Sequence, residues 1–165
     1  MLIRRLIRDF HINTELRVLP TERDADGLAM SSRNVFLGTR RREAALALPE
    51  ALKLAEKQYL KGVRERVEIL ESSSHLMKSR TDAQGLLPQD ERAQFEVDYI
   101  SLADPDTMEE VDVVDEKKGA ILSAAIKMLP LDIVRTDQDR GLMDATNSPV
   151  RLIDNIVLKP IRAAR

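Results

Sequence analysis

The chain contains no cysteine among its 165 residues, so it forms no disulfide and offers no thiolate metal site. This composition is compatible with a reducing compartment, and we expect a cytoplasmic location. No apolar run approaches the roughly 20 residues that a helix needs to cross a bilayer. Basic and acidic residues nearly balance, with 26 Lys and Arg against 28 Asp and Glu. We therefore expect no nucleic-acid and no membrane partner.

A short stretch rich in hydrogen-bond donors is present at residues 26–34, which read DGLAMSSRN. It places the hydroxyls of Ser31 and Ser32 beside the guanidinium of Arg33. Arginine offers a planar fork of donors that fits phosphate oxygens, and each hydroxyl adds another donor. The stretch is therefore a candidate for binding a polyphosphate. Taken alone, it also fits an ordinary turn that caps a helix.

Four blocks of the chain, in the same order along both sequences, resemble the pantoate–β-alanine ligase family, whose members are also called pantothenate synthetases. The four blocks lie at residues 2–9, 18–37, 98–111 and 151–155. The first reads LIRRLIRD, and the second contains the donor-rich stretch. The resemblance covers nearly the whole chain but only about the C-terminal half of the family. We therefore expect a fragment rather than a complete enzyme.

The resemblance implies an α/β protein with two parts. Residues 1–26 would be the last helix and strand of a Rossmann-like nucleotide-binding domain, whose ligands lie beyond the carboxyl ends of its strands. Residues 27–165 would form an α+β lid domain, a small antiparallel sheet packed with helices. Residues 129–149 separate segments that lie almost adjacent in the family, so we interpret them as an inserted, partly disordered loop.

The resemblance also implies a reaction. Members of the family use ATP and Mg²⁺ to activate pantoate as an acyl-adenylate with loss of pyrophosphate, and β-alanine then attacks to give pantothenate and AMP. Carried over by position, Ser31, Ser32 and Arg33 are the implied catalytic residues and would hold the phosphates. Backbone groups of Glu22 and Met30 would line the adenine, although Glu22 replaces the apolar residue usual in the family. The resemblance implies no metal ligand from this chain.

The family motif His-x-Gly-His is absent here, and the two histidines, His11 and His75, lie in unrelated surroundings. We therefore expect the chain alone to be inactive as a ligase. A non-catalytic remnant or a regulatory interaction module is the alternative interpretation. Another carboxylate-activating nucleotidyl transferase is a third, and the resemblance leaves a homodimer of the full-length protein open.

Periodicity and breakers predict the helices. An amphipathic helix is expected over 1–10, and a longer one begins at Thr39 as its N-cap, bends or breaks at Pro49 and stops at Gly62. Another helix is expected over 63–77, with Val67 facing inward. The polar stretch 79–94 is expected to be a mobile connection.

Alternating and β-branched residues predict five strands, at 15–19, 95–100, 111–114, 120–126 and 151–158. The last one contains Asp154 and Asn155, for which we favour a structural role because these side chains readily bond to nearby backbone. His75 is expected at the surface.

Overall fold

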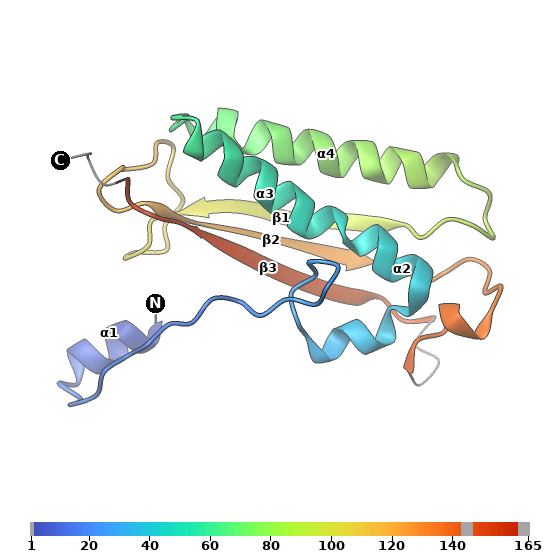
Figure 1. Ribbon diagram of the computed structural model, residues 1–165, viewed down its shortest axis with the longest axis horizontal. Helices are drawn as coiled ribbons and strands as arrows, with labels where there is room; N and C mark the ends of the chain where they lie inside the picture. Colours follow the sequence, from blue (N-terminus) through green and yellow to red (C-terminus); the bar gives the residue numbers. More distant parts are fainter. Residues whose placement is uncertain (1, 143–146, 162–165) are drawn as a thin grey trace.

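A computed structural model describes residues 2–142 and 147–161. Three antiparallel strands lie against a layer formed by two long helices, and α1 sits at the end of an extended segment, apart from the sheet (Figure 1). The elements are α1 (Leu2–Asp9), η1 (Ser32–Phe36), α2 (Gly38–Ala45), α3 (Ala47–Leu60), α4 (Arg66–Leu86), β1 (Phe95–Ala103), β2 (Ala120–Met128), η2 (Asp137–Asp139) and β3 (Val150–Leu158). The expected fold class, a small antiparallel sheet packed with helices, is confirmed.

The sheet has the order β1-β2-β3, so β2 is the central strand. Its residue Ala124 pairs with Ile100 of β1 on one side and with Asp154 of β3 on the other. The core forms where the apolar side chains of this sheet meet α3 and α4, and its members include Leu48, Leu52, Tyr59, Ile69, Met77, Leu122 and Ile126. Burial of this apolar surface holds the helical layer on the sheet.

The predicted interruption of the long helix is confirmed, because a single residue, Leu46, separates the end of α2 from the start of α3. Pro49 lies in the first turn of α3, where a backbone N–H has no helical partner to lose. Gly62 follows the end of α3 with φ of +97°, a left-handed conformation that glycine adopts without strain. The predicted cap at Thr39 is wrong, since Leu37 occupies the N-cap position of α2.

The helix expected over 63–77 begins later and runs much further than predicted, from Arg66 to Leu86. The polar residues in its second half are compatible with a helix whose outer face is solvated, so only 87–94 forms the connection. Val67 is 78% exposed, and Ile69 is buried in its place. His75 is exposed, as expected.

The predicted strands at 95–100, 120–126 and 151–158 are confirmed by β1, β2 and β3. The strand expected over 15–19 is wrong, because no described residue pairs with this exposed segment and a strand needs a neighbour for its backbone hydrogen bonds. The strand expected over 111–114 is also wrong. Within this segment a single isolated bridge joins Val113 to Glu65.

Within the expected loop, the segment 129–142 is anchored to α2, and residues 143–146 lie outside the described residues, so partial disorder of 129–149 stays a prediction. Arg40 of α2 binds both carboxylate oxygens of the buried Asp139, each at 2.9 Å. The two backbones approach so closely that a Cβ on Gly38 would come within 2.2 Å of the Asp139 carbonyl oxygen. Such close packing requires glycine at this position.

We predict that Asp139→Asn lowers the free energy of unfolding by about 2 to 4 kcal/mol, because it leaves the Arg40 cation without its buried carboxylate. Hydrogen bonding from Arg40 holds the pKa of Asp139 below its usual value, so the anion is the native form at neutral pH. Urea unfolding measures the change. The matched control is Asp137→Asn in the same short helix, whose side chain is fully exposed and whose loss we expect to matter little.

An equal loss of stability in both variants would contradict a specific anchor at Asp139.

Candidate functional site

Residues 22–30 fold back on themselves into a hairpin, called the hairpin below. The backbone N–H of Met30 donates to the carbonyl of Glu22 at 2.9 Å, and that of Asp24 donates to Leu28 at 2.9 Å. Gly27 makes the turn with φ of +93°. The two residues predicted to line an adenine, Glu22 and Met30, are therefore direct backbone partners.

The three predicted phosphate-binding residues follow the hairpin directly. Ser31 has an extended backbone and caps η1, where its hydroxyl accepts a hydrogen bond from the N–H of Arg33 at 3.2 Å. The side chains of Ser32 and Arg33 are exposed, and no described residue forms a hydrogen bond or ion pair with the Arg33 guanidinium. This guanidinium is open to a ligand on the solvent side.

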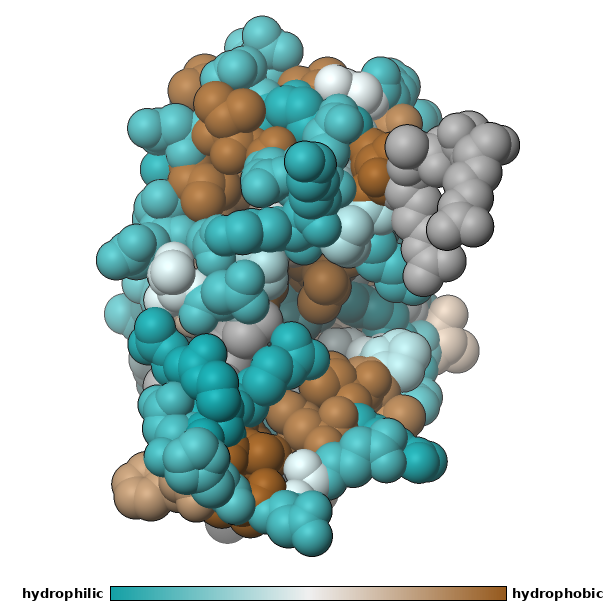
Figure 2. All heavy atoms as spheres, turned by 90° about the vertical axis from the view of Figure 1, so that its left-hand side faces the viewer, coloured by the Kyte–Doolittle hydropathy of each residue, from teal (hydrophilic) through white to brown (hydrophobic). Residues whose placement is uncertain are grey.

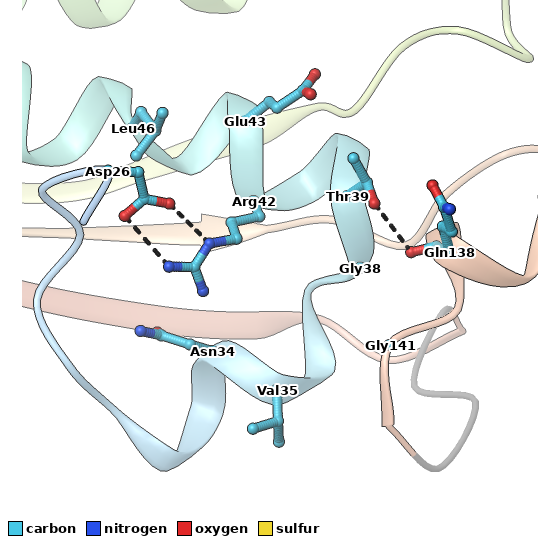
Figure 3. Close-up of a pocket in the computed structure, with 10 residues that line it drawn as sticks. All are labelled: Asp26, Asn34, Val35, Gly38, Thr39, Arg42, Glu43, Leu46, Gln138 and Gly141. Atoms are coloured by element: carbon cyan, nitrogen blue, oxygen red, sulfur yellow. Dashed lines mark hydrogen bonds and ion pairs between the residues drawn. The ribbon is translucent and has the colours of Figure 1, made fainter. Parts of the chain in front are cut away.

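Arg42 of α2 holds the hairpin from one side. Its guanidinium contacts Asp24 at 2.6 Å and Asp26 at 2.7 Å. Figure 3 shows Arg42 reaching from the helix toward Asp26, with Asn34 beyond its guanidinium. Hydrogen bonding from Arg42 lowers the pKa of the Asp26 carboxyl. The contacts of Arg42 with Asp24 and Asp26 join the hairpin to α2.

Asp154 of β3 holds the hairpin from the sheet. Its carboxylate accepts two hydrogen bonds from Arg23, at 2.6 and 3.0 Å, and only 1% of its side chain is exposed. It also accepts the backbone N–H of Asn155 at 2.7 Å, the kind of local contact that the sequence predicts for this residue. The long-range partner is the more informative contact.

A depression of about 530 Å³ opens beside the hairpin; we call it the hairpin groove, and its lining residues are Asp24, Met30, Ser31, Ser32, Asn34, Val35 and Arg42. Asn34 in this lining contacts the hairpin, because its side-chain amide donates to the Ala29 carbonyl at 2.9 Å. Met30, Ser31 and Ser32 are among the residues that line the groove, while Arg33 lies outside its lining. The lining thus combines the two serines with the ion pair of Asp24 and Arg42.

The structure therefore places all five predicted site residues within one continuous unit, the hairpin and the first turn of η1. Their role in binding a nucleotide stays a prediction. Sequence reasoning missed Arg23 and Arg42, which hold this unit in place, and it favoured a structural role for Asp154 without its long-range partner Arg23. One signal was available for Asp154, since a carboxylate at an inward position of an apolar strand needs a buried cationic partner.

Within residues 2–142 and 147–161, no group of three or more His, Cys, Asp or Glu side chains could hold a metal ion. No helix in that part of the chain is long and apolar enough to span a membrane.

Comparisons with known proteins agree with one another. The model of a family described as pantoate-beta-alanine ligase matches residues 1–157. The pantothenate synthetase of Thermotoga neapolitana is 40% identical over 116 residues, which are 70% of this chain and 37% of that protein. That of Chloroflexus aggregans is 36% identical over 158 residues, 96% of this chain and 46% of that protein.

The crystal structure of the pantothenate synthetase from Thermus thermophilus has the same fold, with a TM-score of 0.63 at 25% identity. The alignment covers 96% of this chain and 45% of that one. The chain thus spans less than half of the length of the relatives described here.

The Arg42–Asp26 contact predicts a pH dependence. Because the folded-state pKa of Asp26 lies below its ordinary value of 3.8, its contribution to stability is present above that pH and is lost as the pH falls through the folded pKa. We expect Asp26→Asn to lower the free energy of unfolding at pH 7 by less than about 1 kcal/mol, since the pair is partly exposed. In urea titrations, the difference from the wild type should shrink as the pH falls below 3.8 and vanish below the folded-state pKa.

The control for this titration is Glu71→Gln, which removes an exposed carboxylate from α4. A difference for Asp26→Asn that stays constant from pH 7 to pH 3 would contradict the ionic contact.

Proposed function

Because the chain belongs to the pantoate–β-alanine ligase family, we propose that it supplies the lid side of the ATP site of an enzyme that joins pantoate to β-alanine. The observation that carries this proposal is the exposed Arg33 guanidinium, which no described residue engages, next to two serine hydroxyls at the end of a braced hairpin. Phosphate oxygens are the ligands that such a set of donors fits.

The proposed reaction has two steps. A carboxylate oxygen of pantoate attacks the α-phosphorus of ATP, and the bond to the leaving pyrophosphate breaks. The amine of β-alanine then attacks the acyl carbon, loses a proton and displaces AMP to give pantothenate. The first step builds negative charge on the nonbridging and leaving oxygens, so donors fixed beside them lower the barrier.

Within this scheme, Ser31, Ser32 and Arg33 hold the phosphates of ATP. The paired backbones of Glu22 and Met30 lie against the adenine, a contact that does not depend on either side chain. Mg²⁺ would be held through phosphate oxygens, where it neutralises part of their charge. The Arg33 cation supplies a positive charge from the protein that offsets the negative charge growing on the phosphate.

We propose a boundary between two parts of the whole enzyme at residue 26. Residues 1–26 would complete a Rossmann-like domain, and residues 27–165 would form the lid. The first part exposes apolar side chains that a folded domain would cover, namely Ile3, Leu6, Phe10, Val18 and Leu19. Figure 2 shows apolar side chains among polar ones in the lower part of the face seen there, on the side of the molecule where α1 lies. The hairpin crosses the proposed boundary, and ion pairs from its first half join it to Asp154 and Arg42 of the second part.

We predict that Arg33→Ala weakens binding of Mg·ATP to this chain by at least about tenfold, the loss expected for one charge-assisted contact to phosphate. Thermal unfolding over a range of Mg·ATP concentrations gives the affinity. Arg33→Lys, which keeps the charge but not the fork, should be intermediate. The control Arg80→Ala removes an exposed arginine of α4 that pairs with Glu50, and it should bind like the wild type.

No stabilisation of the wild type by Mg·ATP would contradict the proposal and favour a non-catalytic interaction module.

A second prediction concerns turnover. Since the chain corresponds to less than half of its relatives, we expect these 165 residues alone to release no AMP from ATP, pantoate and β-alanine. Addition of a separately produced N-terminal half of a relative should restore AMP release in a coupled assay. Turnover by the chain alone at the rate of a complete synthetase would contradict this division of the site.

A further inference from the structure

We propose that Arg23 and Asp154 are positioning residues that set the place of the phosphate-binding loop. They lie 131 positions apart in the sequence and join the hairpin to the last strand of the sheet. The inference rests on the proposed function for the role of the loop, but the tether itself is a property of this chain.

The geometry of the pair favours orientation over simple attraction. The Arg23 guanidinium uses two nitrogens on the two oxygens of Asp154, at 2.6 and 3.0 Å, which fixes its plane as well as its distance. The nitrogen at 2.6 Å also donates to the carbonyl of Gly27 at 3.1 Å. One guanidinium nitrogen of Arg23 therefore bonds both to the strand and to the turn of the hairpin.

Burying the Asp154 carboxylate in β3 requires removing its charge from water, which lowers the free energy of unfolding. Asp154 stands in β3 opposite Ala124, between the inward residues Leu152 and Ile156, where an apolar side chain would pack without desolvating a charge. Buried ion pairs are often replaceable by apolar residues with a gain in stability. What an apolar residue cannot supply at Asp154 is a fixed angle for the hairpin.

A shift of the hairpin passes directly to the loop. Arg23 is flanked by Glu22, which accepts the N–H of Met30, and by Asp24, which binds Arg42. Met30 is followed at once by Ser31, the cap of η1. Displacement of Arg23 would thus move the hydroxyls and the Arg33 guanidinium relative to the sheet, and a misplacement of about 1 Å is enough to impair catalytic geometry.

The test is amide hydrogen exchange of the 165-residue chain carrying Asp154→Asn, which keeps the shape of the side chain and removes its charge. We expect the backbone amides of Asp24 and Met30 to exchange at least about tenfold faster relative to the wild type, while amides in the β1–β2 ladder keep their rates. Binding of Mg·ATP to the same variant should weaken by a similar factor. Arg23→Lys should fall between wild type and Asp154→Asn in both measurements.

The matched control is Arg151→Gln on the same strand, which breaks an exposed contact to Asp98 at the outer face and should leave the hairpin amides unchanged. Unchanged exchange at Asp24 and Met30 in Asp154→Asn would overturn the tether. A uniform rise that includes the β1–β2 amides would also overturn the proposal, because Asp154 would then serve the sheet alone. If exchange at Asp24 and Met30 rises as expected but the wild type does not bind Mg·ATP, the proposed function is overturned and the pair is a structural tether only.

Discussion

The interaction on which the position of the hairpin depends is the ion pair between Arg23 and the buried carboxylate of Asp154. The sheet and its two long helices form a core of their own, whereas the hairpin buries a single large apolar side chain, Leu28. Its place on the molecule is therefore decided mainly by charged contacts. Removal of one partner of such a buried pair leaves an uncompensated charge, which makes the pair selective for one arrangement even where its net stabilisation is small.

Ion pairs between arginine and carboxylate side chains recur around the hairpin. Arg42 binds two hairpin carboxylates, and Arg40 of the same helix binds Asp139. These arginines are committed to acidic partners within the chain. Arg33 is different, because no described residue engages its guanidinium. A cation left open beside several paired ones is the feature on which the proposed binding of phosphate rests.

Much of the fold was predictable from local patterns, and the failures have physical causes. The strands around Ala124 and Leu152 have apolar or alternating patterns that match their burial. In β1 the alternation predicts the strand but not its burial, because Val97 is exposed beside a shift in the pairing register. The strand expected over 15–19 has the right pattern but no partner among the described residues, and pattern alone does not create one. The polar end of α4 reads as a loop because an exposed helix carries little apolar signal.

The donor-rich loop was evident from residue types because its chemistry lies in consecutive residues, Ser31 to Arg33. Its bracing was not, since Arg23 and Asp154 are joined only by the folding of the whole sheet between them. The local sequence around Arg23 does not predict Asp154 as its partner, and the reverse is also true. Long-range electrostatic partners are therefore the part of this site that needs a structure.

The most direct test of this account is a double-mutant cycle on that pair. Arg23→Gln and Asp154→Asn are made singly and together, and urea unfolding gives the free energy of each protein. We expect a coupling energy of about 2 kcal/mol, with the double variant less destabilised than the sum of the single variants. Additive losses would show that the two side chains do not depend on each other, and the hairpin would then have to be held in place by something else.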